Sequence, residues 1–318
     1  MLAYRHYTRS LNPDQCLCVD GVAPAKLNLS HWPGNRTPPE LKHDLSTGMA
    51  LKLAQSPDRE RWLQGITTVT NNHWDTDGLC SVYAVLHPRD ALQHGDVLLA
   101  AAMAGDFTMF TTPEGVKIDL TLTALTKHQE SPVASDKFSD DLTRRQAQYE
   151  FGLELLPKLL NDPDLHMEWI SDDYRAIQND LRSLREDESM LEVMAALDFA
   201  VVRSDRRLSE AAVNTAAGMD RYLEVTPEGS SFLYMCRYTT LSWFELAQKR
   251  QRPDWTSLVA ELTALTGSPW HAEELTDPTP QLWHGDEAGP KACPVPPERV
   301  VPVVSRFFTK HPFLPAGL

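Results

Sequence analysis

Three short apolar segments that each end in polar residues constrain the fold of this chain more than any other feature. They read C-L-C-V-D-G at residues 16–21, K-L-N-L-S-H at residues 26–31 and G-I-T-T-V-T-N-N-H at residues 65–73. Apolar runs of this length with polar residues at their ends indicate buried strands. Helical spacing of apolar residues occurs at residues 38–54, 79–86 and 96–104. This alternation predicts an α/β fold with a mostly parallel sheet flanked by helices.

The rest of the chain contains a second series of helix and strand patterns. A charged helical pattern covers residues 140–184 and is interrupted by Pro157 and Pro163, which is typical of a connector. After it come an apolar strand-like run, a small-residue helix and a hairpin that turns at residues 227–229. We therefore expect an N-terminal α/β domain at residues 1–130, a helical connector at 131–188 and a smaller C-terminal α/β domain with a mixed sheet at 189–318.

The charge of the chain limits the class of partner. The sequence has 44 acidic residues and 30 lysines and arginines, so the formal net charge is −14 at pH 7. This excess opposes binding to the phosphate backbone of long nucleic acids, although a local basic pocket can still hold a small anion. The sequence contains no apolar run of about 18 residues, and its five cysteines show no C-x-x-C pairing. We expect a reduced cytoplasmic protein that binds neither a membrane nor long nucleic acid; its oligomeric state stays open.

The sequence N-N-H-W-D-T-D-G-L-C-S at residues 71–81 contains the strongest candidate site. His73, Asp75 and Asp77 occupy every second position after a predicted strand, so their side chains would project to the same side of an extended chain. Two ionised carboxylates held this close repel each other, and a divalent cation between them removes that cost. Gly78 would let the chain turn tightly into the next helix. The pattern therefore indicates a metal site.

A purely structural explanation exists for each of these residues taken singly. Asp75 or Asp77 would cap the helix that is predicted from Leu79, and His73 would be an ordinary surface residue. This explanation accounts poorly for all three together. A calcium-binding EF-hand loop also begins with D-x-D-G, but the twelfth residue counted from Asp75 is Leu86, where such a loop has a glutamate.

The sequence H-W-D-T-D-G-L-C-S resembles the first motif of the DHH phosphoesterase superfamily, H-x-D-x-D-G-x-x-S. Members of that superfamily cleave phosphoester or phosphoanhydride bonds with two metal ions, usually manganese. Three further stretches resemble its other motifs: C-L-C-V-D-G with Asp20, L-N-L-S-H-W-P-G-N-R-T-P with His31, and A-A-A-M-A-G-D-F with Asp106. The third motif has L-S-H-W in place of D-H-H, and the second and third motifs precede the first, as in a circular permutation. The same N-terminal layout is also similar to that of a bacterial family without an established activity.

The permuted order is compatible with a single shared site. Ligands of an open α/β sheet gather at the carboxyl ends of its strands, whichever strand comes first in the chain. The resemblance implies that Asp20 bridges two divalent ions, with manganese the expected metal. It assigns His73 and Asp75 to one ion, and His31, Asp77 and Asp106 to the other. Oxygen and imidazole ligands also suit iron or zinc.

The resemblance further implies a phosphoesterase or related hydrolase that acts on a small phosphorylated substrate, such as a nucleotide or short oligonucleotide. A metal-activated water would be the nucleophile, and the C-terminal domain would cover the substrate. In such an enzyme Asp20, His31, Asp75 and Asp77 are catalytic as well as metal-binding. Two other functions stay open: a sensor or binding module that keeps the metal cluster without turnover, and a metal-free α/β protein whose aspartates cap helices.

Three polar residues outside the acidic ligand set are candidates for substrate binding. Asn35 and Arg36 follow His31 in the same predicted loop, and Arg237 stands out in the acidic second half of the chain. Arginine can pair bidentately with a phosphate group. The alternative for each of the three is an ordinary surface position.

Overall fold

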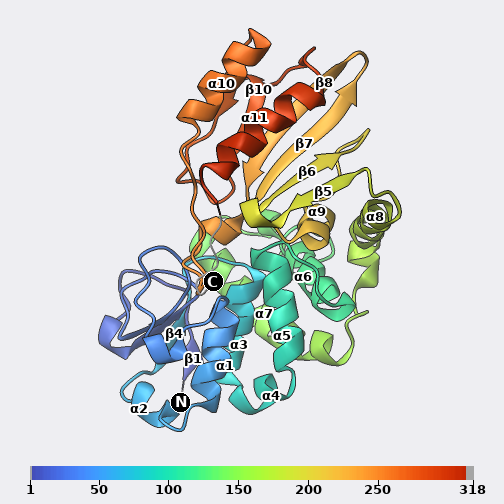
Figure 1. Ribbon diagram of the computed structural model, residues 1–318. Coiled ribbons are helices and arrows are strands. Elements are labelled where there is room, and N and C mark those ends of the chain that lie inside the picture. The colour runs from blue at the N-terminus through green and yellow to red at the C-terminus, as the bar shows by residue number, and fades with distance from the viewer. Residues whose placement is uncertain (1, 313–318) are drawn as a thin grey trace. The chain divides into compact units, whose positions relative to one another are not determined.

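The protein folds as two compact units, Met1–Ala176 and Ile177–Leu318. The structure is a computed structural model that describes residues 2–312. Each unit combines a β-sheet with helices (Figure 1), which confirms the predicted α/β class. The sheet of the first unit is parallel and that of the second is mixed, as predicted.

The N-terminal unit is built around a parallel sheet with the strand order β1-β4-β2-β3. Its strands are β1 (Ala3–Tyr4), β2 (Cys16–Val19), β3 (Leu27–Leu29) and β4 (Thr68–Thr70). β2 lies inside the sheet and is buried along its whole length, as expected for a parallel strand that is covered on both faces. β2, β3 and β4 each fall within a segment that the sequence predicts as a strand. Because these strands are parallel, their carboxyl ends share one edge of the sheet.

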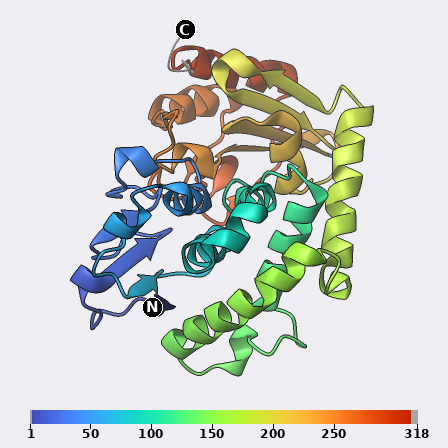
Figure 2. The same cartoon turned by 90° about the horizontal axis from the view of Figure 1, so that it is seen from below.

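Helices cover this sheet and extend its core. They are α1 (Ser46–Gln55), α2 (Arg59–Trp62), α3 (Thr76–Leu86), α4 (Pro88–Gln93), α5 (Gly95–Asp106), α6 (Pro113–Leu125), α7 (Asp141–Asn161) and α8 (Met167–Glu186). α1 and α3 pack on the strands and on each other, α5 packs on α3, and α6 packs on α5. Figure 2 shows the blue strands with cyan and teal helices beside them. The buried core runs from Leu17 and Val69 in the sheet to Leu98 and Leu122 in the helices.

The helix that periodicity predicts at residues 38–54 begins later than predicted. Pro39–Leu41 form a 3-10 turn, and α1 starts only at Ser46. The carbonyl of Asp44 accepts a hydrogen bond from Nδ1 of the His31 ring at 2.5 Å, and Leu45 is extended. Contacts with the loop after β3 therefore determine the backbone before α1.

Residues 131–188 are largely helical, as predicted, but α7 is part of the N-terminal core and not a separate connector. Tyr149 and Leu156 of α7 are completely buried, and the Tyr149 ring stacks on Tyr4 of β1 with the centroids 4.4 Å apart. An apolar stripe on α7 thus packs against the first unit. The boundary between the compact units accordingly lies inside α8, between Ala176 and Ile177.

The C-terminal unit contains a mixed sheet with the strand order β11-β10-β8-β7-β6-β5, and β9 pairs with β10. Its strands are β5 (Leu191–Met194), β6 (Phe199–Arg203), β7 (Arg221–Glu228), β8 (Ser231–Tyr238), β9 (Trp270–Ala272), β10 (Gln281–Asp286) and β11 (Gly289–Pro290). β6 and β7 run parallel, whereas the other neighbouring strands are antiparallel. The predicted hairpin joins β7 to β8, but it turns at residues 229–230, because Pro227 and Glu228 still pair with β8.

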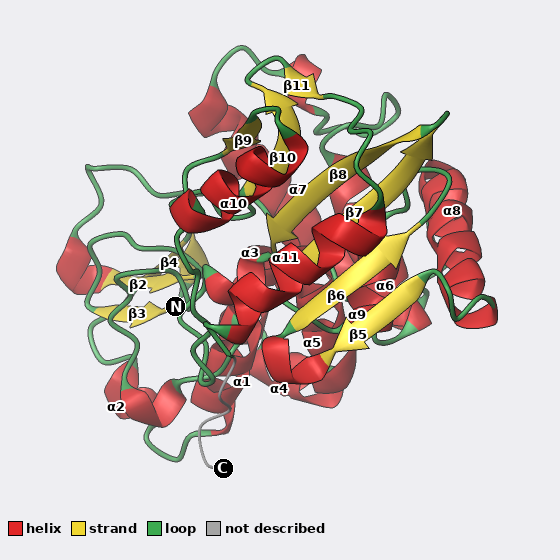
Figure 3. Ribbon diagram, turned by 45° about the horizontal axis from the view of Figure 1, so that its top comes forward, coloured by secondary structure: helices red, strands yellow, loops and turns green. Residues whose placement is uncertain are grey.

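Helices complete the C-terminal unit. They are α9 (Glu210–Ala217), α10 (Thr256–Thr266) and α11 (Pro297–Thr309). α10 and α11 lie over one face of the mixed sheet (Figure 3), where Val304 and Phe308 of α11 pack in the same core as Phe199 and Tyr238 of the strands. Within the described residues of both units, no helix has the length and apolar character needed to cross a membrane.

Candidate metal centre

Three of the six predicted ligands follow the parallel strands at their shared edge. Asp20 comes directly after β2, His31 follows β3 and His73 follows β4. Asp20 and His31 are completely buried. The parallel topology therefore brings together side chains from three separate segments, as the carboxyl-end rule predicts for an open sheet.

The backbone at Asp20 is shaped to present its carboxylate. Asp20 has a φ of 47°, in the left-handed region that residues other than glycine rarely adopt. Its N–H donates to the carbonyl of Leu29 at 2.8 Å, which joins the end of β2 to the end of β3. At the next position, a Cβ on Gly21 would lie 2.5 Å from Oδ1 of Asn72, so a larger residue there would displace the Asn72 side chain. Strained backbone of this kind is concentrated at functional sites.

Asp75 has two structural roles at the start of α3. It is the N-cap residue, and its Oδ1 accepts a hydrogen bond from the N–H of Gly78 at 2.7 Å. Its other oxygen, Oδ2, lies 2.6 Å from Nε2 of His73. The capping explanation and the candidate-ligand explanation of this aspartate thus apply together, one to each oxygen.

Asp77 lies in the first turn of α3 and contacts the start of α1. Its Oδ2 accepts a hydrogen bond from the N–H of Ser46 at 2.8 Å, and its Oδ1 accepts one from the N–H of Thr47 at 2.7 Å. No side chain at the N-cap position of α1 forms a capping hydrogen bond, so Asp77 satisfies these helix N–H groups in its place. A carboxylate at a helix N-terminus is also stabilised by the helix dipole.

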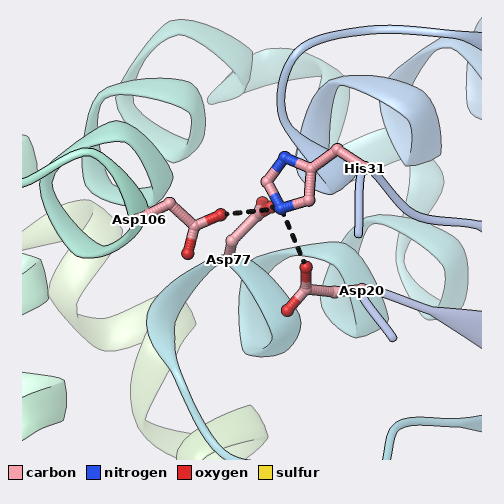
Figure 4. A group of neighbouring side chains, drawn as sticks. All are labelled: Asp20, His31, Asp77 and Asp106. Atoms are coloured by element: carbon pink, nitrogen blue, oxygen red, sulfur yellow. Dashed lines mark ion pairs between the residues drawn. The ribbon is translucent and has the colours of Figure 1, made fainter. Parts of the chain in front are cut away.

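His31 lies among three carboxylates (Figure 4). Its Nε2 is 3.1 Å from Asp106 Oδ2, 3.4 Å from Asp20 Oδ1 and 3.8 Å from Asp77 Oδ2. Asp106 is the last residue of α5, the small-residue helix. Ser46 of α1 adds a hydrogen bond from its Oγ to Asp20 Oδ1 at 3.0 Å, so α1 contacts two of the carboxylates.

The six predicted ligands form two donor groups that share one residue. We define the inner group as Asp20, His31, Asp77 and Asp106, and the outer group as Asp20, His73 and Asp75. In each group the candidate ligand atoms lie within 4.8 Å of one another. This division of the side chains is the one that the family resemblance implies. A carboxylate shared between two donor groups is what a two-metal site requires.

The two groups differ in exposure to solvent. The inner-group side chains are buried, with at most 6% of a side chain exposed at Asp106. In the outer group, His73 and Asp75 have 21% and 31% of their side-chain surface exposed. Solvent therefore reaches the outer group more readily than the inner group.

Burial and mutual repulsion dominate the electrostatics of the carboxylates. Burial raises the pKa of Asp106 well above its ordinary value, and the charge of Asp77 raises it further, against the lowering effect of His31. Burial and the charge of Asp20 likewise raise the pKa of Asp75. For Asp20, the contacts with His31 and His73 outweigh burial and the Asp77 charge, so its pKa is lowered.

The two histidines respond to these carboxylates. Burial alone would lower the pKa of His31, but its contacts with Asp106 and Asp20 raise it well above the ordinary value. The pKa of His73 is raised in the same way against burial, by Asp75 and Asp20. A cation that enters the centre must therefore displace protons from both rings.

The donor set fits divalent cations. Within the described residues, no lysine or arginine forms an ion pair with Asp20, Asp75 or Asp77; the ion pairs recorded for Asp20, Asp75 and Asp77 involve only the two histidines. Burying carboxylates is costly, and in this centre the protonated histidines, or a cation that replaces their protons, offset that cost. Carboxylate oxygen and imidazole nitrogen suit manganese, iron and zinc.

Gly78 is required for close packing and not for the tight turn that the sequence suggests. It lies inside the first turn of α3. A Cβ at this position would lie 2.3 Å from Nδ2 of Asn71, 2.6 Å from the Tyr149 hydroxyl and 2.9 Å from Asp75 Oδ1. Ser46 and Thr47, which hold Asp20 and Asp77, were not predicted from the sequence; the only signal was a Ser-Thr pair inside a predicted apolar helix.

A comparison with protein-family models places the whole described chain in one family. Residues 2–313 match the family of unknown function DUF6687. The chain belongs to this family. No curated protein and no solved structure shows significant similarity to it. The six side chains of the centre are therefore features of a DUF6687 chain, and their function has to be argued from geometry.

The predicted substrate-binding residues Asn35 and Arg36 lie in the loop that follows His31. Asn35 maintains its own loop, because its Nδ2 donates to the Trp32 carbonyl at 3.0 Å and its Oδ1 accepts from the Thr37 N–H at 3.2 Å. Arg36 is exposed and lines a different cavity, which contains none of the six ligands.

Arg237 is not the exposed phosphate-binding residue that the sequence suggests. It lies on β8 of the C-terminal unit and is only 3% exposed. Its Nε donates to Glu224 Oε1 at 2.9 Å, one terminal nitrogen donates to Asn214 Oδ1 at 2.9 Å, and its guanidinium lies 4.3 Å from the ring centroid of Tyr222. Sequence alone did not reveal these partners, which come from β7 and α9.

Proposed function

We propose that the protein is a dinuclear, manganese-dependent phosphoesterase or related hydrolase that acts on a small phosphorylated substrate. One observation carries the proposal: the inner and outer groups meet at Asp20, whose two oxygens face different histidines. Oδ1 lies 3.4 Å from His31 Nε2, and Oδ2 lies 3.0 Å from His73 Nε2. A carboxylate with this orientation can bind one cation through each oxygen.

The inner and outer groups would each hold a divalent cation, and such cations would supply an activated water and neutralise charge on the phosphoryl group. The chain contributes the positions of the donors. Hydrogen bonds from Ser46 and Thr47 hold Asp77 in the inner group, and the Ser46 hydroxyl holds Asp20. Capping of α3 holds Asp75 in the outer group. These contacts fix the donors before a substrate arrives, which reduces the reorganisation that catalysis would need.

The difference in solvent exposure between the outer and inner groups supports different roles for their two cations. The outer group, with the partly exposed His73 and Asp75, leaves room for a substrate oxygen, as an open catalytic site does. The inner group surrounds its position from four residues and is closed to solvent. We therefore assign substrate contact to the outer group and retention of the second cation to the inner group.

The charge of the chain supports a small substrate. A net charge of −14 opposes long polyanions, whose binding depends on the release of many counterions. A nucleotide, a short oligonucleotide or a phosphorylated metabolite carries few charges, and the bound cations can neutralise them. The net charge of the chain therefore favours a small phosphorylated substrate, and substrate assays can identify the individual compound.

Hydrolysis of two model substrates by the manganese-loaded protein tests the proposal. Bis(p-nitrophenyl) phosphate reports phosphodiester cleavage, and a five-nucleotide RNA reports cleavage of a biological substrate. We expect turnover of at least one of them, and a loss of about 100-fold or more in Asp106→Asn and Asp75→Asn. Asp173→Asn removes an exposed carboxylate on α8 and should hydrolyse them as the unmodified protein does.

Three outcomes would decide between the proposed function and its alternatives. Turnover that requires manganese and both aspartates supports the enzyme. Binding of two manganese ions without cleavage of either substrate, or of a panel of nucleotides, would favour a metal-binding module. Protein that binds no manganese and melts at the same temperature with and without it would leave the aspartates with capping roles only.

A further inference from the structure

A second polar cavity lies in the N-terminal unit, apart from the metal centre. Its volume is about 920 Å³, which is in the size range of small-molecule sites. It is bordered by the edge strand β3, the turn Pro39–Leu41, the C-terminal half of α1, and α2. None of the six candidate metal ligands lines it.

The cavity is positively charged although the chain is acidic. Its lining includes Lys26, Arg36, Lys52 and Arg61, against the two acidic residues Glu40 and Asp58. Four positive and two negative groups give a local charge of +2, whereas the whole chain carries −14. A concave basic surface concentrates anions.

The cationic groups of this cavity are not neutralised by the protein. Within the described residues, none of the four forms an ion pair with a carboxylate. The ammonium groups of Lys26 and Lys52 donate to the backbone carbonyls of Gln64 and Lys42. The guanidinium groups of Arg36 and Arg61 are therefore available for an anion, and guanidinium matches the geometry of a phosphate.

The wall that carries Arg36 is held in place by a buried side chain. Asn28 of β3 is only 3% exposed and lines the cavity. Its Nδ2 donates to the carbonyls of Cys18 and Gly21 at 3.2 and 2.8 Å, and its Oδ1 accepts from the N–H of Arg36 at 3.0 Å. Asn28 of the strand thus holds the backbone of Arg36 in place, so a ligand would not have to order this part of the loop.

The cavity also offers a planar apolar surface and backbone groups. Trp62 of α2 is half-buried, packs against the N-terminal core and is one of the residues that line the cavity. Aromatic rings of this kind stack on nucleobases. β3 is the edge strand of the sheet, so its outer side presents unpaired backbone groups that can bond the polar edge of a base.

We propose that this cavity binds a nucleoside phosphate, with Arg36 and Arg61 on the phosphate groups and Trp62 against the base. The site is separate from the metal centre and needs no cation. Pyrophosphate would use the same two arginines without the ring contact. The cavity is thus a nucleotide site in addition to the proposed hydrolytic centre.

Calorimetric titration of ADP into the chelator-treated full chain at low ionic strength tests the proposal, because salt screens such contacts. We expect saturable binding, and at least about tenfold weaker binding in Arg36→Ala/Arg61→Ala, since two charge-assisted contacts are lost. Arg175→Ala/Arg207→Ala removes two arginines whose side chains are 69% and 68% exposed elsewhere and should bind ADP normally. Melting temperatures identify any variant that fails to fold.

Two further variants separate this site from the metal centre and test the ligand class. Asp106→Asn should bind ADP as tightly as the unmodified chain, since Asp106 does not line the cavity. Trp62→Leu should weaken ADP binding and leave pyrophosphate binding unchanged. The proposal is overturned if the unmodified chain does not bind ADP at millimolar concentration, if the double arginine variant binds it normally, or if Asp106→Asn abolishes binding. Equal ADP affinity in Trp62→Leu would exclude recognition of the base.

Discussion

Asp77 and Thr47 are joined by two hydrogen bonds that connect the start of α3 to the start of α1. The Thr47 N–H donates to Asp77 Oδ1 at 2.7 Å, and the Thr47 hydroxyl donates to the Asp77 carbonyl at 3.2 Å. Both residues are completely buried. A candidate metal ligand is therefore also the cap of a core helix, and its two roles can be separated experimentally.

Replacing Asp77 should lower stability even without metal. Asp77→Ala leaves the N–H groups of Ser46 and Thr47 without acceptors, and unsatisfied buried donors cost about 1–3 kcal/mol each. We expect the free energy of unfolding of the chelator-treated protein to fall by about 2–4 kcal/mol in a urea titration. Asp77→Asn keeps one acceptor oxygen and should lose less. Equal stability of Asp77→Ala and the unmodified chain would contradict the capping role.

Replacing Asp106 should leave the stability of the metal-free protein nearly unchanged and should reduce its stabilisation by manganese. Burial and the Asp77 charge disfavour the ionised carboxylate by raising its pKa, and a neutral amide of the same shape avoids that repulsion. Asp106→Asn should therefore be as stable as the unmodified metal-free protein, within about 1 kcal/mol. The rise in melting temperature caused by manganese should be lost or greatly reduced. A full manganese-induced rise in this variant would show that Asp106 is not a ligand.

The two groups should release their cations at different rates. His73→Gln should retain one manganese ion per chain and His31→Gln should lose the inner one, as measured by elemental analysis after gel filtration. In the unmodified protein, a chelator added in excess should remove metal in two phases, because the outer group is partly exposed and the inner group is not. A single phase that removes both ions together would argue against the distinction between the groups.

Asp119 should make stability depend on pH. It lies on α6, is 7% exposed and accepts a hydrogen bond from the Thr76 hydroxyl at 2.6 Å. Burial raises its pKa from 3.8 to about 7, with a further rise from the Asp75 charge and a partial lowering by Thr76. The folded protein thus holds this proton more tightly than the unfolded chain, so stability falls as pH rises between these two values.

Asp119→Asn keeps an acceptor for Thr76 and removes the titrating group. Relative to the unmodified metal-free protein, its stability should increase from pH 4 to pH 7, by at most about 4 kcal/mol. Denaturant titrations across this range measure the difference. Asp173→Asn provides the control, since its carboxylate is exposed and its difference from the unmodified protein should not change with pH. A flat difference for Asp119→Asn would contradict the assigned pKa.

Arg237 should be needed for folding of the C-terminal unit and not for phosphate binding. Arg237→Met leaves Glu224, whose side chain is 20% exposed, without its partner, and we expect a loss of about 3 kcal/mol in unfolding free energy. The double variant Arg237→Met/Glu224→Gln should recover part of this loss, because no unpaired charge remains. A change in ADP or substrate affinity with unchanged stability would instead support the phosphate-binding role that the sequence suggested.

The strands that carry the centre were predictable because they fall in short segments rich in apolar or β-branched residues that end in polar residues. β2, β3 and β4 lie in such segments, and their parallel arrangement places Asp20, His31 and His73 at one edge. β1 covers only Ala3–Tyr4 and β11 only Gly289–Pro290, so these two strands have too few residues to show a period. The pairing of β1 depends on a neighbour that is distant in sequence.

The roles of polar residues were less predictable, because they depend on partners from other elements. The residues next to Arg237 in the sequence do not predict its contact with Glu224 on the adjacent strand. The residues next to Asp77 likewise do not predict its hydrogen bonds to the N–H groups of α1. Gly78 illustrates the same limit: its position in the motif suggested a turn, while the space around it is occupied by Asn71 and Tyr149. Residue type predicted where chemistry could occur, and tertiary contacts determine which atoms face each other.

The capping duties of Asp75 and Asp77 have a consequence for tracing the evolution of this family. A descendant that had lost its cations would still be under selection to keep both aspartates, since Asp75 caps the start of α3 and Asp77 caps the start of α1. Survival of the D-x-D pair is therefore a poor marker of activity among relatives. Asp106 ends α5 and lies 3.1 Å from His31 Nε2, so its presence or loss together with His31 is a more informative character for dividing active from inactive lineages.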